Sequence, residues 1–145
     1  MKPLIFTLIL FALVSCKENK NQNTIDKSSL YSNSWVKEIK LNKGLKWKAN
    51  VETNEGVVKM QKSIKSQSTK TLIEYYKLAE ILNKNKNYVI KKCSMKGDSH
   101  DNLHVWLLPL MAKINALSET KSIKDASKLK ESIKENIDAY NDYFN

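Results

Sequence analysis

The residues best suited to chemistry lie together in one short segment, residues 93–104. This segment contains Cys93, Met95 and the two histidines of the chain, His100 and His104. Thiolate, thioether and imidazole are donors that soft transition-metal ions prefer. The sequence therefore predicts a metal site here.

The spacing of these residues favours a single site. His100 and His104 are four residues apart, which on a helix places their Cβ atoms about 5–6 Å from each other. Cys93 ends the preceding helical stripe, and a tight turn at Lys96-Gly97 would bring its sulfur back over the first turn of the next helix. We expect Cys93, Met95, His100 and His104 to surround one ion.

The types of ligand indicate which ion. Thiolate together with thioether favours Cu(I), whereas imidazole also suits Cu(II) and zinc. Because thioether is an unusual ligand for zinc, we expect copper first, as Cu(I), and zinc second. The positive end of the helix dipole would keep the imidazole of His100 neutral and help to hold Cys93 as a thiolate. Asp98 and Asp101 would orient the ring nitrogens through hydrogen bonds.

Each of these residues also has a purely structural interpretation. His104 shares a helix side with Leu103 and Leu107, as a buried histidine bonded to a carbonyl would. Met95 would then pack on the domain, and Cys93 would be a small buried apolar residue. The alternative to a metal site is a structural or protein-interaction role without metal. A histidine phosphotransfer module is a further alternative, which export away from ATP disfavours.

The amino terminus has the pattern of an export signal. Lys2 precedes an almost unbroken apolar run over residues 4–14, too short for a membrane span of about 20 residues. Leu13-Val14-Ser15-Cys16 resembles the lipobox of bacterial lipoproteins, whose cysteine is acylated. The resemblance implies that the signal peptide, residues 1–15, is removed and that Cys16 carries acyl chains such as palmitate, which anchor the protein to a membrane.

The resemblance also bears on location. Lys17 follows the cysteine, where lipoproteins retained in the inner membrane usually have aspartate. We therefore expect a place in the cell envelope, on the outer membrane of a Gram-negative bacterium. With Cys16 acylated, Cys93 is the only remaining thiol, so no internal disulfide can form.

The net charge of the chain restricts the classes of partner that we expect. The formal net charge is +10, and every basic residue is lysine. Proteins that read nucleic acids rely on the bidentate contacts of arginine, so we expect no nucleic-acid partner. The lysines would provide solubility and attraction to an anionic membrane surface or an acidic partner.

Two stretches of different composition follow the expected lipid anchor. Residues 16–34 are rich in Asn, Lys and Ser and lack an apolar period, which predicts a lipidated, flexible and disordered tether. From Trp35 to Trp47 apolar and charged residues alternate, which predicts a short extended strap. The domain would then comprise residues 35–145.

Four stretches with helical periodicity follow, at about 53–64, 72–93, 98–114 and 123–144. Thr53 and Asp98 are the expected N-caps of the first and third, and Pro109 should kink the third. Amphipathic helices joined by short breaks favour an antiparallel bundle. The predicted fold is all-α, an antiparallel four-helix bundle preceded by the strap and the tether.

Two blocks of this domain resemble small exported helical proteins associated with heavy-metal handling in Gram-negative bacteria. They are Gly44-x-Lys46-Trp47-x-Ala49-Asn50-x-Glu52-Thr53-x-x-Gly56-Val57 and Cys93-x-Met95-x-Gly97-x-x-His100-x-x-Leu103-His104-x-Trp106-Leu107-x-Pro109. The similarity covers about residues 44–145. It implies a metal-linked role. We expect the protein to act as a metal chaperone, buffer or sensor, with another envelope metal-handling protein as a candidate partner.

Catalysis is not expected. The sequence offers no nucleophile–base–orienter set, glycine-rich phosphate loop or paired-carboxylate cleft. We therefore expect a binding protein rather than an enzyme.

Overall fold

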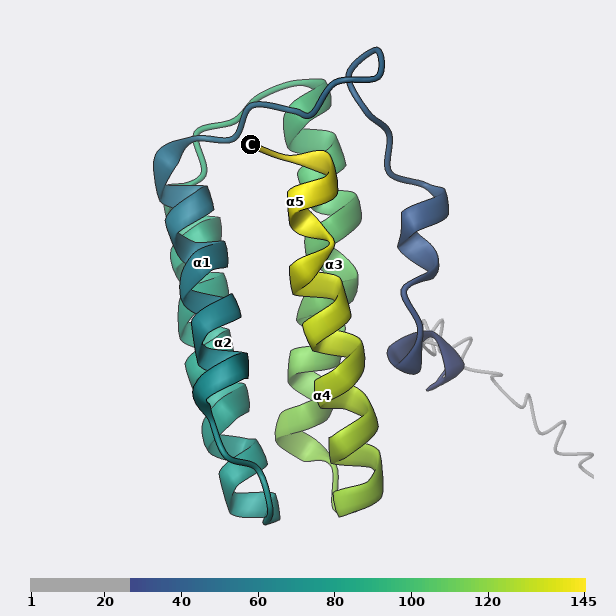
Figure 1. Cartoon of the computed structure of the whole chain (residues 1–145), viewed down its shortest axis with the longest axis vertical. Coiled ribbons are helices and arrows are strands. Elements are labelled where there is room, and N and C mark those ends of the chain that lie inside the picture. The colour runs from purple at the N-terminus through teal and green to yellow at the C-terminus, as the bar shows by residue number, and fades with distance from the viewer. Residues whose placement is uncertain (1–26) are drawn as a thin grey trace, which may run out of the picture.

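The computed structural model describes residues 27–145, so the expected signal peptide, Cys16 and most of the expected tether lie outside the described residues. Four long helices run up, down, up and down, and a single-turn helix follows them (Figure 1). The all-α, antiparallel four-helix bundle that the sequence predicts is confirmed. The helices are α1 (Val51–Ser66), α2 (Leu72–Lys92), α3 (Asp98–Glu119), α4 (Ile123–Asp138) and α5 (Tyr140–Tyr143).

The helix ends follow local capping chemistry. Thr71 and Glu74 form a reciprocal capping box at the start of α2, and the Ser122 side chain accepts the Asp125 N–H at the start of α4. The two N-caps expected from the sequence were wrong. α1 begins after Asn50, so Thr53 is already inside the helix, where its hydroxyl donates to Asn50 Oδ1.

The start of α3 differs in a similar way. Its N-cap is Gly97, which makes no side-chain hydrogen bond, and Asp98 is the first residue of the helix. Gly97 has a φ of +59°, a conformation that glycine adopts at little cost. Pro109 lies inside α3, which continues to Glu119.

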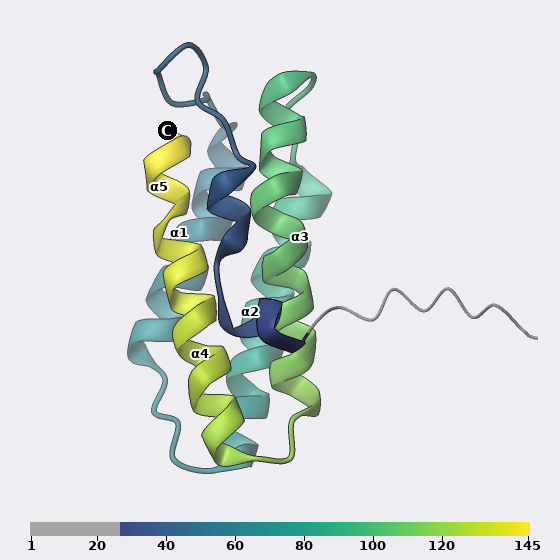
Figure 2. The ribbon, with the colours of Figure 1, turned by 90° about the vertical axis from the view of Figure 1, so that its right-hand side faces the viewer.

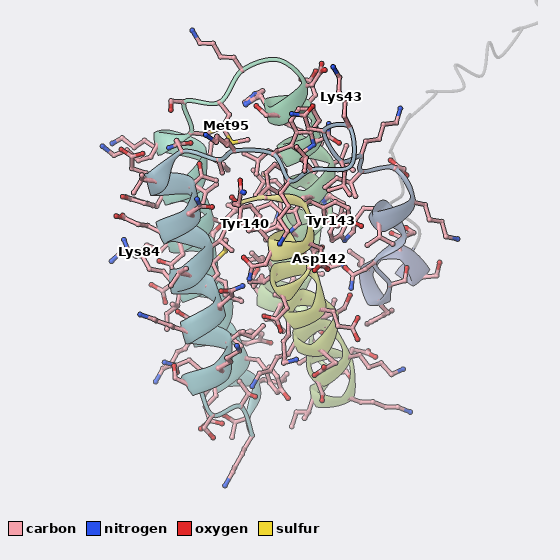
Figure 3. The ribbon with its side chains drawn as sticks, turned by 45° about the horizontal axis from the view of Figure 1, so that its top comes forward. Lys43, Lys84, Met95, Tyr140, Asp142 and Tyr143 are labelled. Carbon is pink, nitrogen blue, oxygen red and sulfur yellow. The ribbon has the colours of Figure 1, made fainter. Side chains whose placement is uncertain are left out.

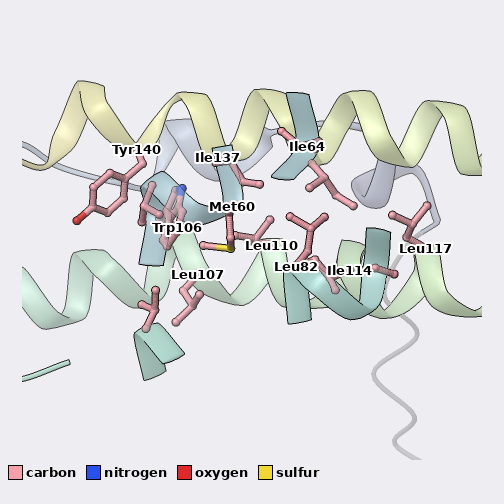
Figure 4. Close-up of a cluster of buried hydrophobic side chains, with 14 of the residues drawn as sticks. Met60, Ile64, Leu82, Trp106, Leu107, Leu110, Ile114, Leu117, Ile137 and Tyr140 are labelled. Carbon is pink, nitrogen blue, oxygen red and sulfur yellow. The ribbon is translucent and has the colours of Figure 1, made fainter. Parts of the chain in front are cut away.

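Apolar side chains from all four long helices meet along the bundle axis. Met60 on α1, Leu82 on α2, Trp106 on α3 and Ile137 on α4 are fully buried and lie in one cluster (Figure 4). The Trp106 indole N–H donates to the Asn136 carbonyl, so its one polar atom is satisfied inside this core. Buried side chains of α3 form part of this core, and α3 carries both histidines.

Before α1, residues 27–37 lie beside α3 and α4, and the chain then passes over one end of the bundle to reach α1 (Figures 1 and 2). It forms two 3-10 helices, Lys27–Tyr31 and Ser34–Lys37, and then continues to an isolated bridge between Asn42 and Leu45. The last residues of the expected tether, 27–34, therefore contact the bundle, and much of the expected extended strap is helical or looped. Within the alternating stretch Trp35 is buried, whereas Leu45 is exposed.

Polar contacts explain this docking. Asn33 donates to the Ser132 carbonyl and to Glu135, and it accepts hydrogen bonds from the Trp35 indole and from Lys113. A half-buried amide with these partners fixes the segment in one place, which an apolar period alone cannot do. We call residues 27–50 the N-terminal segment.

No helix among residues 27–145 has the length and apolar character needed to cross a membrane.

Candidate metal site

Cys93, His100 and His104 meet where α2 passes into α3. Cys93 is the residue directly after α2, and its N–H bonds to the Val89 carbonyl in the last turn of that helix. The loop of residues 94–97 then reverses the chain, and His100 lies in the first turn of α3. The bundle topology therefore brings the thiol and the two imidazoles together.

The distances among these side chains are short. Cys93 Sγ lies 3.7 Å from His100 Nδ1, and His104 Nε2 lies 3.0 Å from His100 Nε2. The two imidazole rings have centroids 4.5 Å apart and meet edge to face. His100 therefore bridges Cys93 and His104 through its two ring nitrogens.

This bridge differs from the single four-ligand centre expected from the sequence. The sulfur and the second imidazole contact opposite sides of the His100 ring, so the three side chains do not surround one point. Among the described residues no group of three or more His, Cys, Asp or Glu side chains has an arrangement suited to a metal ion. Two pairs of donor atoms do lie close enough to share one ion. One pair is Cys93 Sγ with His100 Nδ1, and the other is the Nε2 atoms of His100 and His104.

When no cation is bound, the contacts among Cys93, His100 and His104 require one proton between each pair of facing atoms. In one arrangement the Cys93 thiol donates to His100 Nδ1, and His100 Nε2–H donates to His104 Nε2. In the other, His104 Nε2–H donates to His100 Nε2, and His100 Nδ1–H donates to the Cys93 sulfur. Each ring nitrogen of His100 has a partner in both arrangements, so the ring is held in a fixed orientation.

An apolar cavity of about 230 Å³ lies beside the bridge. Cys93, His100 and His104 supply its polar atoms, and neither a carboxylate nor a lysine lines it. The remaining wall is aliphatic or thioether: Val89, Ile90, Leu103, Leu107, Leu108 and Met111. The donors therefore face a region of low polarity on one side.

The other expected site residues lie elsewhere. Met95 is half-buried in the loop between α2 and α3 and packs against the hydrophobic core, outside the wall of this cavity (Figure 3). Asp98 and Asp101 have exposed side chains, and within residues 27–145 neither carboxylate bonds to an imidazole. Both ring nitrogens of His100 are instead occupied by Cys93 and His104.

Asn50 positions the loop that carries the cysteine. Its side-chain N–H donates to the Lys92 carbonyl, and its Oδ1 accepts the Ser94 N–H. The start of α1 is thereby tied to the residues on either side of Cys93. The sequence has no signal for this role, because Asn50 is far along the chain from residues 92–94.

Met111 was also missed as a neighbour of the site. It lies on α3 two turns after His104, and its half-buried side chain lines the cavity. The spacing of seven residues from His104 was the available signal, since residues seven apart share a helix face.

Tyr140 approaches the site from α5. Burial, and to a lesser degree the negative charge of a Cys93 thiolate, raises the pKa of Tyr140 above its ordinary value. Its hydroxyl donates to Asn54 Oδ1 at 2.8 Å. Tyr140 is therefore a neutral hydrogen-bond donor at ordinary pH.

No known family model, curated protein or solved structure matches this chain.

Proposed function

We propose that the protein is a membrane-anchored lipoprotein of the cell envelope that binds a soft transition-metal ion, copper(I) first and zinc second. It would act as a chaperone, buffer or sensor. The observation that carries this proposal is the 3.7 Å separation between Cys93 Sγ and His100 Nδ1. Two ligands on a tetrahedral zinc ion, with bonds of about 2.3 Å to sulfur and 2.0–2.1 Å to nitrogen, lie roughly 3.6 Å apart.

Charge favours a monovalent ion at this position. A Cys93 thiolate neutralises one positive charge, and no carboxylate lines the cavity to neutralise a second. An unbalanced charge beside an apolar wall is costly because it loses its hydration. Copper(I), which is both soft and monovalent, fits better than a divalent ion.

His104 would then position the ring of His100. A histidine that binds a metal through one nitrogen usually donates a hydrogen bond from the other nitrogen. With an ion on Nδ1, His100 Nε2–H would donate to His104 Nε2 across the observed 3.0 Å. In this proposal Cys93 and His100 bind the ion, His104 orients His100, and Met95 is not needed.

The experiment is a measurement of bound copper per chain after equilibration of the full-length protein with Cu(I) under reducing conditions. We expect one ion per wild-type chain and none in Cys93→Ser. A double variant, Cys93→Ser with Ser94→Cys, is the matched control, since it moves the thiol to the next residue. Copper binding restored by that variant would show that the ion needs only a free thiol. Equal amounts of bound copper in Cys93→Ser and in the wild type would contradict the proposal.

The membrane anchor is tested separately. Cells grown with labelled palmitate should produce a labelled protein in the membrane fraction, and Cys16→Ala should abolish both the label and the membrane location. Cys93→Ala is the matched control because it removes the other cysteine, and it should leave the label in place. Label that follows Cys93 instead would contradict the anchor.

A reactive thiol is the second candidate function. One imidazole between a thiol and a second orienting group is also the arrangement of a nucleophile, its base and an orienter. The measurement is the alkylation rate of Cys93 in metal-free protein relative to glutathione. A fast rate that falls in His100→Ala, in a protein without stoichiometric copper, would favour this candidate over copper binding.

A further inference from the structure

We infer that this site, besides Cu(I), also binds a soft cation that carries an apolar group, a monovalent organometallic cation such as an arylmercury(II) species. This inference rests on the proposed metal-binding function and names a further class of cargo for the same site. It comes from the cavity of about 230 Å³ beside Cys93, which is far larger than a bare ion requires.

The number of donors supports such a cargo. Only two donor atoms face any common position, and no larger group of His, Cys, Asp or Glu side chains suited to a metal occurs within residues 27–145. A bare zinc ion prefers four ligands. A cation with a covalently bound organic group already has one ligand, so the Cys93 sulfur, assisted by His100, suffices.

Charge points to the same class. A cation of the form R–Hg⁺ has one positive charge, which a single thiolate neutralises. The cavity wall contains no carboxylate for a second charge. The neutral thiolate complex can therefore lie against an apolar wall without a cost for an unpaired charge.

The cavity also suits the organic group. Six of its lining residues are aliphatic or thioether. An apolar cavity of about 150 Å³ in another protein stays dry and binds benzene, so a phenyl ring is of suitable size here. Burial of the ring removes apolar surface from water, which would favour a phenyl over a methyl group.

The binding step is balanced. The S–H bond of Cys93 breaks, a sulfur–mercury bond forms and the water on mercury leaves. The thiol proton passes to His100 Nδ1, which lies 3.7 Å from the sulfur, and then to solvent. The carbon–mercury bond stays intact, and no atom is oxidised or reduced.

The test compares phenylmercury with methylmercury on the full-length protein, each in competition with glutathione. For each thiol, the measured quantity is the ratio of its affinity for phenylmercury to its affinity for methylmercury. We expect this ratio to be about tenfold or more higher for the protein than for glutathione. An equal preference in protein and glutathione would overturn the inference, because any accessible thiol binds both probes.

Two variants at the cavity mouth locate the preference. Ile90→Trp and Leu108→Trp change residues that are 46% and 56% exposed and that line the cavity, so either tryptophan can fill it from outside. Both should reduce the phenyl preference to that of glutathione while methylmercury still binds. Ile73→Trp is the matched control, since Ile73 is 65% exposed on the same helix as Ile90 and outside the cavity wall.

The outcomes separate this inference from the proposed function. Stoichiometric Cu(I) binding without a phenyl preference would overturn the inference alone. Loss of both Cu(I) binding and the phenyl preference would overturn both. A phenyl preference that persists in both mouth variants would show that the cavity is not its cause and would also overturn the inference.

Discussion

His100 and His104 face each other across one turn of α3, with their Nε2 atoms 3.0 Å apart. Two nitrogen lone pairs at this distance repel, so a proton or a cation must lie between them. The other nitrogen of His100 contacts the Cys93 sulfur, so the state of this pair is linked to the state of the thiol.

The two histidines should contribute unequally to metal binding. We expect His100→Ala to lose stoichiometric Cu(I), because it removes a ligand. His104→Gln should keep the stoichiometry and lower the affinity by about 10- to 100-fold, the usual cost of removing a group that orients a ligand. Titration against a Cu(I) chelator measures both, and equal losses in the two variants would contradict the distinct roles.

Met95 should be dispensable for the metal. Its side chain packs on the core and does not line the cavity. We expect Met95→Leu, which keeps a similar volume, to bind Cu(I) with unchanged stoichiometry and affinity. Cys93→Ser is measured in parallel as the variant that should fail. A clear loss of Cu(I) affinity in Met95→Leu would show that the Met95 thioether is a ligand and would contradict this prediction.

Lys113 should make the stability of the fold depend on pH. It is 1% exposed, and its ammonium contacts Asn33 and Asn136. Burial lowers the pKa of Lys113 to about 8, and the charge of Glu135 opposes this shift in part. Between this value and the ordinary pKa of 10.5, the unfolded chain binds more protons than the folded one, so stability rises with pH.

Urea denaturation at pH 8, 9 and 10 measures this effect. We expect the free energy of unfolding to rise by about 2 kcal/mol over that interval in the wild type, and Lys113→Met should remove most of the rise. Burial also lowers the pKa of Lys86, so Lys86 adds to the rise in stability with pH. Its contribution remains in Lys113→Met. Above about pH 10 the raised pKa of Tyr140 acts against the rise, because the folded state then binds more protons. Identical slopes in the two proteins would contradict the assignment to Lys113.

Gly56 should not tolerate a side chain. A Cβ atom there would lie 2.4 Å from Val89 Cγ2, where α1 and α2 pack closely. We expect Gly56→Ala to destabilise the fold by about 1–3 kcal/mol, since overpacking outweighs the gain in helix propensity. Val58→Ala, at an exposed position on the same helix, is the control and should change stability by less than about 0.5 kcal/mol. A stabilised Gly56→Ala would show that the helices can move apart.

The fold could be predicted from the sequence because its signals are local. Apolar residues at helical spacing and short polar breaks suffice for four antiparallel helices, and α1 ends at Ser66, close to the end of the first predicted stretch. The N-caps were harder to predict. Thr53 and Asp98 have suitable side chains, but the chain enters each helix earlier, at Asn50 and Gly97.

The candidate site could be predicted only in part. The spacing of His100 and His104 on one helix, and the place of Cys93 at the end of another, correctly indicated that these side chains meet. The sequence could not indicate which ring nitrogen faces which partner, since that depends on side-chain orientation. It also could not place Asn33 on Lys113, because this contact joins residues far apart in the chain and has no periodic signal.

Copper K-edge X-ray absorption on the Cu(I)-loaded full-length protein identifies the atoms bound to copper. We expect one sulfur ligand and imidazole nitrogen around copper, and we expect the sulfur contribution to disappear in Cys93→Ser and to persist in Met95→Leu. Copper surrounded only by oxygen and nitrogen ligands in the wild type, or a sulfur contribution that survives Cys93→Ser, would contradict a Cys93–His100 copper site.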